Sequence, residues 1–353
     1  MKRSENVDIL RSIAIYMIVI YHCYAITQPT FQHFTILSKI IGYWGEIGVT
    51  LFFIMSGFGI SCSLKKQSLG GDKISWLNFM KRRIKRVVPQ YYVCLIIMLL
   101  LTDWSSQIAV DGLQSIVTHF FFIHNLWVST HGTINGAMWT MGTIVQFYVV
   151  AMFIQKLMER NIYFTTIVAV VITIVSKMVT FFIVTKYIGE NGTYYFVYGR
   201  QLITALDNFV VGMCIGNIYS ERDNVCEKWK NWIYVLIFVV GVFFATFFID
   251  GKGLYTNTIW GWTWHSILAF LLGGIVYFVI RCPMPSGKLK DALVKVSKYE
   301  YGIYIWHIVI IYNLVQKSPI FSALAQRSYC IFSLCIVIIC TVVGYFSTKF
   351  IDK

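Results

Sequence analysis

Long apolar runs, each about as long as a bilayer crossing, follow one another along almost the whole chain. A helix needs about 20 predominantly apolar residues to cross the hydrocarbon core of a membrane. The pattern therefore predicts an all-α, polytopic membrane helix bundle of about ten transmembrane helices. The predicted spans are residues 9–27, 44–63, 87–102, 136–155, 163–185, 196–219, 232–249, 259–280, 300–316 and 329–350.

One apolar segment does not fit this series. Residues 114–128 are too few for an ordinary span, and they include the polar residues His119, His124 and Asn125. Polar backbone and side chains at membrane depth are tolerated where they are covered by protein. The segment is therefore either an additional span or a re-entrant segment that does not cross.

Composition agrees with the membrane assignment. The chain is 57% hydrophobic and 13% charged, whereas a soluble domain is roughly 25% charged. No segment outside the spans is long enough for a second folded domain, so we expect one membrane domain over residues 1–353. The run Ile9–Ile26 is too long for a signal-peptide core and lacks a clear small-residue cleavage site, so we expect it to be retained. These features predict a multi-pass protein of the cell (plasma or inner) membrane.

The net charge of +14 raises the question of nucleic-acid binding, but its distribution indicates membrane orientation. If residues 114–128 do not cross, 22 of the 30 Lys and Arg residues fall on one side of the membrane and 5 on the other. Cytoplasmic loops collect Lys and Arg, so both termini are predicted to be cytoplasmic. The remaining three basic residues, Arg11, Lys177 and Arg200, lie within predicted spans.

The nine cysteines show no spacing typical of a metal site or of a redox pair. Several lie inside apolar runs, where a free cysteine behaves as a small apolar residue. We therefore expect no bound metal and no permanently bound cofactor.

Ionisable residues inside a bilayer are costly and often functional, and the first span carries three. Arg11 and His22 are eleven residues apart, which places them on one helix face about 16 Å apart along the axis. Asp8 lies one turn before Arg11, close enough to pair with it. The alternative interpretation of His22 is a hydrogen-bonded packing residue.

A basic segment, residues 81–92, leads into the third span. Within it Arg83 and Arg86 are one helical turn apart and project from one face. Basic residues here serve topology or contact anionic lipid headgroups under one interpretation. Arginine also binds phosphate oxygens in a bidentate manner, so a cytoplasmic phosphate-bearing donor is the other interpretation. The sequence leaves the two open.

Three further titratable residues lie within later spans. Arg200 and Asp207 are seven residues apart, and on a continuous helix they share a face, so an ion pair between them is expected. Lys177 is expected to pair with a carboxylate such as Asp207 or to line a polar cavity. His307 is either an active-site residue or a packing histidine.

Four segments of the chain, in order from the first predicted span to the ninth, resemble the signature segments of one known family. They are Asp8-Ile9-Leu10-Arg11 followed by ten residues and then His22, Gly45–Phe58 (GEIGVTLFFIMSGF), Arg83–Pro89 (RIKRVVP) and Ser297–His307 (SKYEYGIYIWH). On these segments the chain is identified as a member of the acyltransferase-3 family of integral membrane acyltransferases.

One segment departs from the family pattern. Trp139–Tyr148 (WTMGTIVQFY) stands where many members have W-S-L-x-x-E-x-x-F-Y, and the acidic position of that motif is Ile144 here. This difference weakens the transfer of any substrate preference from the family to this chain.

The resemblance implies transfer of an acyl group, commonly acetyl, from cytoplasmic acyl-CoA to a hydroxyl of an extracytoplasmic saccharide or lipid-linked glycan. It implies that His22 is essential and acts with Arg11, while Arg83 and Arg86 support the donor. Candidate supporting residues are Asp8, Ser56, Trp139 and His307. The expected partners are acyl-CoA, the glycan acceptor and membrane lipids, without nucleic acid. We expect no hydrolase-like domain fused to the membrane part, and this expectation favours a stand-alone modifier of capsule, O-antigen or exopolysaccharide.

The working hypothesis places the donor phosphates near Arg83 and Arg86, with the thioester near His22 acting as general base on the acceptor hydroxyl. An imidazole with an unperturbed pKa of about 6.5 suits that role. Intramembrane Arg, His, Lys and Asp would equally suit a glycan or lipid transporter, and a non-catalytic assembly subunit is the third alternative. The residues favour neither acetyl over a longer acyl group nor direct transfer over an acyl-enzyme.

Overall fold

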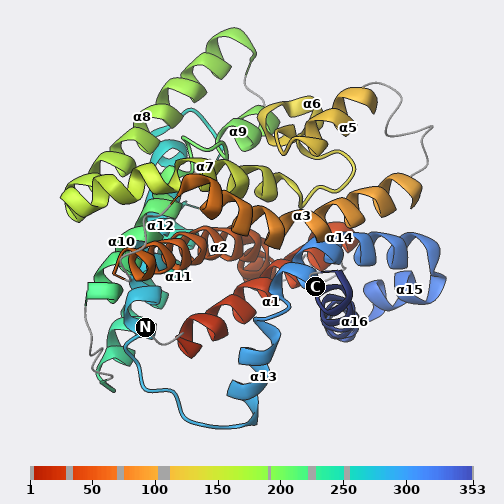
Figure 1. The fold of residues 1–353 in the computed structure, drawn as a ribbon. Coiled ribbons are helices and arrows are strands. Elements are labelled where there is room, and N and C mark those ends of the chain that lie inside the picture. Colours follow the sequence, from red (N-terminus) through yellow and green to blue (C-terminus); the bar gives the residue numbers. More distant parts are fainter. Residues whose placement is uncertain are drawn as a thin grey trace.

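The structure, a computed structural model, describes residues 4–28, 35–69, 75–101, 112–189, 192–221, 228–249 and 255–351. Within these ranges every regular element is helical (Figure 1), which confirms the predicted all-α class. In chain order the elements are α1 (Glu5–Thr27), α2 (Thr35–Leu69), α3 (Trp76–Leu101), α5 (Gly112–Phe120), the 3₁₀ turn η2 (His124–Leu126), α6 (Val128–His131), α7 (Trp139–Arg160), α8 (Ile162–Tyr187), α9 (Gly192–Tyr198), α10 (Leu206–Glu221), α11 (Asn231–Ile249), α12 (Ile259–Val279), α13 (Lys288–Val296), α14 (Glu300–Lys317), α15 (Pro319–Arg327) and α16 (Tyr329–Ile351).

Within the described residues, eight helices are long and apolar enough to cross a membrane, namely α1, α2, α3, α7, α8, α11, α12 and α16. A ninth crossing is obtained if α14 and α15, which meet at an angle of 100°, count as one broken span. Proline fits the first turn of a helix, and Pro319 begins α15 directly after this bend. Six basic residues counted in the charge distribution lie outside the described residues: Lys2, Arg3, Lys73, Arg222, Lys252 and Lys353.

The predicted span 196–219 is not one helix. Helix α9 ends at Tyr198 and α10 begins at Leu206, with a turn between them. The side chain of Thr204 stabilises this turn by pairing two backbone groups. Its hydroxyl donates to the Tyr198 carbonyl at 2.8 Å and accepts from the Gln201 N–H at 2.9 Å. The break places Arg200 in a turn instead of on a helix face.

Residues 114–128 form no continuous crossing helix either. Helix α5 has nine residues, and η2 and α6 are shorter still, far below the length of about 20 that a span needs. The His119 and His124 rings stack in the interior with centroids 3.8 Å apart. Burial lowers the pKa of His119 to about 4, so this histidine is neutral near pH 7. The segment therefore consists of short helical pieces whose polar residues His119, His124 and Asn125 are buried.

Helices α1 and α2 pack closely and run antiparallel. A Cβ added to Gly45 would stand 2.6 Å from the ring of Tyr21, so only glycine allows this approach. Further along, the Arg11 guanidinium donates to the Met55 carbonyl at 3.5 Å. Tyr21 is therefore level with Gly45 and Arg11 with Met55. The two ends of α1 face different parts of α2.

Helix α2 also packs against α10, and again glycine permits the contact. A side chain at Gly212 would overlap the backbone carbonyl of Ile54, and one at Gly57 would overlap that of Phe209. Small residues let helix backbones approach in this way inside membranes. The pairing places α10 and its preceding turn against the middle of α2.

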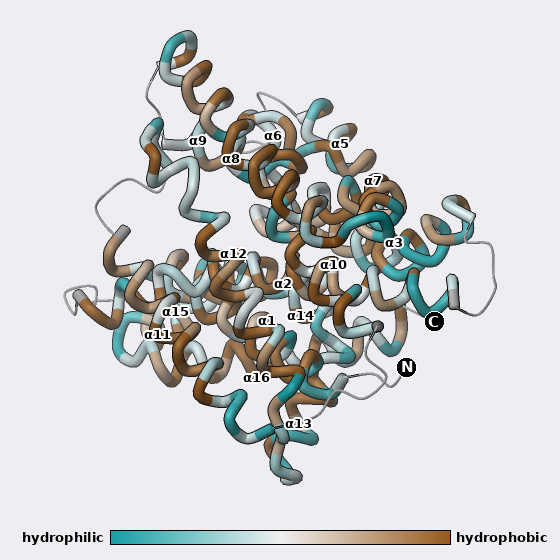
Figure 2. Tube along the Cα trace, turned by 90° about the vertical axis from the view of Figure 1, so that its left-hand side faces the viewer, coloured by the Kyte–Doolittle hydropathy of each residue, from teal (hydrophilic) through white to brown (hydrophobic). Residues whose placement is uncertain are grey.

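Apolar side chains face outward on the peripheral helices. Helix α8 is hydrophobic along its length (Figure 2), and Ile167, Val171, Val175 and Phe182 are exposed on it. A helix that is apolar on its outer surface suits contact with lipid tails. Polar residues such as Lys177 and Asp207 instead lie in the interior of the bundle.

Candidate functional site

A cavity of about 700 Å³ opens among α1, α2, α3, α7 and α14. Its wall includes Asp8 and Arg11 from α1, Ser56 from α2, and Arg83 and Arg86 from α3. Five of the eight residues selected from the sequence therefore surround one cavity. Within the described residues five cationic side chains line it against two carboxylates, and the cations are Arg11, Lys66, Arg83, Arg86 and Lys298.

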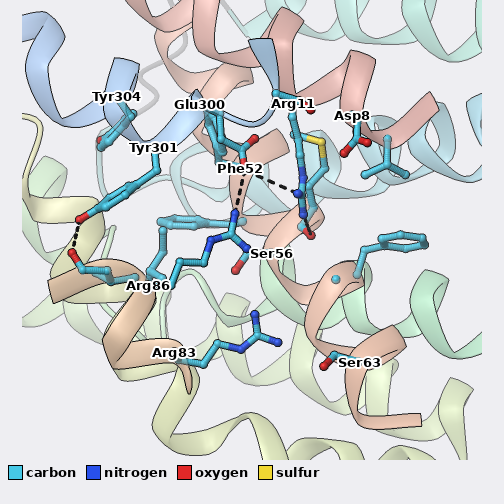
Figure 3. A pocket seen from close by; sticks show the side chains of 18 of the residues that line it. Asp8, Arg11, Phe52, Ser56, Ser63, Arg83, Arg86, Glu300, Tyr301 and Tyr304 are labelled. Atoms are coloured by element: carbon cyan, nitrogen blue, oxygen red, sulfur yellow. Dashed lines mark hydrogen bonds and ion pairs between the residues drawn. The ribbon is translucent and has the colours of Figure 1, made fainter. Parts of the chain in front are cut away.

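Glu300, at the start of α14, joins two of these arginines. Its Oε1 lies 3.5 Å from Arg11 Nη1 and 3.4 Å from Arg86 Nη2 (Figure 3). The Glu300 side chain is 10% exposed and that of Arg86 is 56% exposed, so the carboxylate lies deeper than the Arg86 guanidinium. The structure thus gives Arg11 a partner on another helix, Glu300, in addition to any interaction with the neighbouring Asp8 that the sequence predicts.

Arg83 has no ion-pair partner among the described residues. Its guanidinium lies 5.2 Å from the ring centroid of Phe79 and 5.9 Å from that of Tyr148, and it points into the cavity (Figure 3). An arginine held by aromatic rings keeps its N–H donors available. Arg83 and the exposed Arg86 thus offer donors for an anionic group.

The inner end of the cavity is mostly apolar. Phe52, Phe53, Met141 and Ile144 line it together with Tyr304. Ile144, which replaces the acidic residue of the family motif, therefore faces this cavity and makes the wall apolar. An unbranched chain carrying few charges fits this part better than a phosphate.

His22 and His307 form a hydrogen-bonded pair. His22 Nδ1 lies 2.9 Å from the Ile18 carbonyl and 3.2 Å from His307 Nε2. His307 Nδ1 lies 2.5 Å from the Tyr304 carbonyl. A carbonyl only accepts, so both Nδ1 atoms carry the proton and His307 Nε2 is an acceptor. The Nε2 of His22 is then left unprotonated, with no partner among the described residues.

The cavity and the histidine pair are adjacent, but His22 does not line the cavity. Tyr304 lies between them: it contacts the cavity, and its ring centroid is 5.5 Å from that of His307. Its hydroxyl donates to the Ala137 carbonyl at 2.7 Å and lies 2.6 Å from Thr140 Oγ1. Tyr304 is therefore a residue of the cavity wall that also contacts the histidine pair.

Trp139 is not part of the cavity wall. The ring of His131 stacks on it with centroids 5.5 Å apart, and the Arg200 guanidinium lies 4.7 Å from its centroid. Only 7% of Trp139 is exposed. It supports Arg200 and offers no open face to a sugar ring.

The predicted Arg200–Asp207 pair is wrong, because the turn before α10 removes the helical register that it assumed. Arg200 forms its ion pair with Glu46 on α2. Asp207 accepts from Ser266 Oγ at 2.5 Å and from the Asn208 N–H at 2.7 Å. The buried Lys177 Nζ has no hydrogen-bond partner among the described residues, so its predicted pairing with Asp207 is not formed either.

The sequence interpretation missed Glu300, Tyr304 and Glu46. Glu300, Tyr304 and His307 are spaced i, i+4 and i+7 on one helix and therefore share a face. This spacing relative to His307 could have indicated Glu300 and Tyr304 as site residues. Glu46 stands beside Gly45 in the glycine-rich segment, but nothing local indicated its partner, which is 154 residues away. Within the described residues no three His, Cys, Asp or Glu side chains are placed to hold a metal ion.

With this geometry established, comparison with known proteins decides the family. The family described as Acyltransferase domain, the acyltransferase-3 family, matches residues 4–344. The chain belongs to this family. The matched range covers both the arginine-lined cavity and the histidine pair, so the features described above belong to the family domain.

Curated relatives of this acyltransferase-family chain are named O-acetyltransferases. O-acetyltransferase OatA of Staphylococcus aureus (strain NCTC 8325 / PS 47) is 23% identical over 333 residues, which cover 87% of this chain and 50% of the relative. A putative O-acetyltransferase of Staphylococcus aureus (strain MSSA476) is 24% identical over 88% of this chain and 51% of the relative. The chain thus spans about half the length of the curated relatives it matches. No solved structure matches it.

Proposed function

We propose that this chain is a membrane O-acetyltransferase that moves an acetyl group from acetyl-CoA to a hydroxyl of a glycan on the other side of the membrane. The observation that carries the proposal is the arrangement along α1. Arg11 faces a cation-lined cavity, and His22, three turns further, has an unprotonated Nε2. Family membership and the names of the relatives agree with it.

Donor binding follows from the charge of the cavity. Coenzyme A carries several phosphate charges at one end and a thioester at the other. Arg83 and the exposed Arg86 offer guanidinium donors to phosphate oxygens. The apolar inner end, with Phe52 and Ile144, then accepts the pantetheine arm and the acyl group. The thioester reaches His22 once the Tyr304 side chain moves aside.

His22 supplies the base. Its Nε2 takes the proton of the acceptor hydroxyl as the oxygen attacks the thioester carbonyl carbon. When the intermediate collapses, the C–S bond breaks and the thiolate of CoA takes that proton from the imidazolium. His307 Nε2, accepting the Nδ1 proton of His22, stabilises this positively charged ring during the transfer. No net proton is released.

The acceptor side follows from membrane topology. The charge distribution favours a cytoplasmic position for the Arg83 end of the cavity, on the side where acyl-CoA is made. His22 lies about 16 Å from Arg11 along α1. A hydroxyl approaching His22 from the opposite side meets the acyl group without crossing the bilayer. An acceptor at the outer surface, such as capsule, O-antigen or another surface glycan, fits this geometry.

The test uses the purified chain in lipid nanodiscs with radiolabelled acetyl-CoA and the surface glycan of its own cell. We expect release of free CoA thiol together with a labelled ester on the glycan. His22→Ala should lower both by at least about 10²-fold while acetyl-CoA still raises the melting temperature of the protein. Undiminished ester formation in this variant would contradict the proposal. Glycan movement across a vesicle membrane without any consumption of acetyl-CoA indicates a transporter instead.

A further inference from the structure

A second polar cluster lies beside His22, on the side away from the arginine-lined cavity. It is formed by side chains from α2, from the α9–α10 turn, and from the start of α12 with the residues before it. We call it the Glu46 cluster, and it consists of Glu46, Arg200, Tyr255 and His265.

Each member of the Glu46 cluster contacts another. The Arg200 guanidinium donates to Glu46 Oε1 and, at 2.7 Å, to the Tyr255 hydroxyl. Tyr255 in turn donates to Glu46 Oε1 at 2.6 Å, and His265 Nε2 lies 3.5 Å from Glu46 Oε2. The cluster holds one full positive and one full negative charge, so its charges balance.

Aromatic rings surround Arg200. Its guanidinium carbon lies 3.5 Å from the centroid of Phe196, 4.7 Å from that of Trp139 and 5.5 Å from that of Tyr255. Phe196 and Tyr255 pack against each other with centroids 5.3 Å apart. Trp139 is buried, but Phe196 and Tyr255 are each partly exposed. These two partly exposed rings lie beside the ion pair.

The Glu46 cluster is close to the catalytic base. Tyr21 packs on Gly45, next to Glu46, and its ring centroid is 4.9 Å from that of His22. Arg200 is near enough to interact electrostatically with both His22 and Tyr21. A molecule lying over the cluster therefore reaches His22 past a single tyrosine.

Two side chains of the Glu46 cluster are partly exposed, and the internal space beside the cluster is small. The Arg200 side chain is 12% exposed and that of Glu46 is 16% exposed. The Arg200 hydrogen bonds within the described residues use Nε and Nη2, which leaves the Nη1 donors without a protein acceptor there. The internal space under the cluster is only about 10 Å³, about enough for one water molecule. A ligand must therefore bind across the cluster and not inside it.

We propose that the Glu46 cluster binds the acceptor of the proposed transfer reaction, and that it selects an uncharged sugar ring over a carboxylated one. This inference rests on the proposed function. A sugar presents C–H faces that pack on aromatic rings and hydroxyls that exchange hydrogen bonds with Glu and Arg. Phe196 and Tyr255 supply the rings, while Glu46 and Arg200 supply an acceptor and a donor.

The proposed selectivity for uncharged sugars follows from the balanced charges of Glu46 and Arg200. Arg200 is already neutralised by Glu46, so a uronic acid carboxylate brought to Arg200 would face the Glu46 carboxylate within a few ångströms. Like charges at such distances repel strongly in a partly buried site. Hydroxyl groups meet no such repulsion. Removing the charge of Glu46 should therefore weaken neutral-sugar binding and favour a carboxylated sugar.

The experiment uses the chain in nanodiscs and two matched probes, galactotriose and trigalacturonate, which differ in the oxidation of C6. Binding is measured by titration, and acetyl-CoA turnover is measured separately as thiol release. We expect galactotriose to bind at least about tenfold more tightly than trigalacturonate. Glu46→Gln should weaken galactotriose binding about tenfold and reverse the preference, while the Kd for acetyl-CoA stays unchanged. Arg200→Gln combined with Glu46→Gln, which leaves no unpaired charge, should bind neither trisaccharide.

Arg281→Lys is the matched control, since Arg281 also lies over an aromatic ring, 3.8 Å from the centroid of Tyr277, away from the Glu46 cluster. It should retain the binding of the unsubstituted chain. Absence of galactotriose binding, equal binding of the two probes, or an unchanged preference in Glu46→Gln overturns the proposal. Failure of the proposed function is distinct, because it appears as no acetyl-CoA turnover with any acceptor whatever the binding result.

Discussion

At the residue scale, the chemistry of His22 depends on a proton that another histidine positions. Two carbonyl oxygens, those of Ile18 and Tyr304, fix the tautomers of the pair. The result is that His22 Nε2 keeps its lone pair while His22 Nδ1 donates to His307. An imidazole held in this way is a better base than a freely rotating one, because the correct tautomer is already selected.

His307→Ala should lower kcat for acetyl transfer by about 10²-fold with little change in KM for acetyl-CoA. The substitution removes the acceptor for the His22 Nδ1 proton but leaves the donor cavity intact. Steady-state kinetics of thiol release separate kcat from KM. His307→Gln, whose side-chain oxygen can accept the same proton, should recover part of the rate. Equal rates in the Ala and Gln variants would contradict a positioning role.

Arg83→Ala should raise KM for acetyl-CoA about tenfold and leave kcat nearly unchanged. Arg83 has no ion-pair partner among the described residues and points into the cavity, so its loss removes a phosphate contact without disturbing another pair. Arg82→Ala is the matched control, because Arg82 does not line the cavity and instead donates to Gln67 at 2.6 Å. The same rise in KM for both variants would show that overall charge, and not this position, matters.

Sequence reasoning located residues better than it located their partners. Helical spacing placed Arg11 and His22 on one face and brought Arg83 and Arg86 to one cavity, since these relations lie within one turn or one helix. The partner of Arg200 was predicted within the same helix and was wrong, and the pairing of Arg11 with Glu300 was not predicted. Both lie in distant elements, Glu300 and Glu46, and a single sequence carries no local signal for contacts across a bundle.

At the element scale, three glycine-mediated contacts fix α2 between α1 and α10. Their consequence is the register that sets Arg11 level with Met55 and Tyr21 level with Gly45. The predicted α-class and most spans followed from apolar length alone. The break between α9 and α10 could not be predicted from apolar length, because the apolar run continues through it. The turn is stabilised by hydrogen bonds of the Thr204 side chain to the backbone.

Gly212→Ala should lower the melting temperature of the chain by several degrees. The new methyl group overlaps the Ile54 carbonyl, and overpacking of this kind costs about 1–3 kcal/mol. Gly132→Ala is the matched control, because no heavy atom lies within 4 Å of a Cβ at that position. Thermal unfolding in detergent, followed by intrinsic fluorescence, compares the two variants. Equal melting temperatures would show that α2 and α10 are not in close contact.

At the scale of the whole molecule, α1 runs between two chemically different regions, the cation-lined cavity and the Glu46 cluster. The cation-lined cavity surrounds the Arg11 end of α1, and the Glu46 cluster lies near the Tyr21 end. Because α14 runs beside α1 and carries Glu300, Tyr304 and His307 on one face, the same two helices contribute to the proposed donor cavity and to the proposed base. A donor and an acceptor that never share a compartment can meet only in such an arrangement.

Orientation in the membrane therefore decides whether the donor can reach the cavity, because acyl-CoA is charged and does not cross a bilayer. We expect the start of α3 to face the cytoplasm and the end of α14 to face outward, as the positive-inside rule predicts. Lys81→Cys and Lys317→Cys, two exposed lysines at these ends, give a matched pair, with the unsubstituted chain as the blank for natural cysteines. A membrane-impermeant maleimide should label Lys317→Cys in intact cells and Lys81→Cys only after permeabilisation. The opposite pattern would place Arg83 and Arg86 outside, where no acyl-CoA is present, and would leave the cavity without the donor proposed for it.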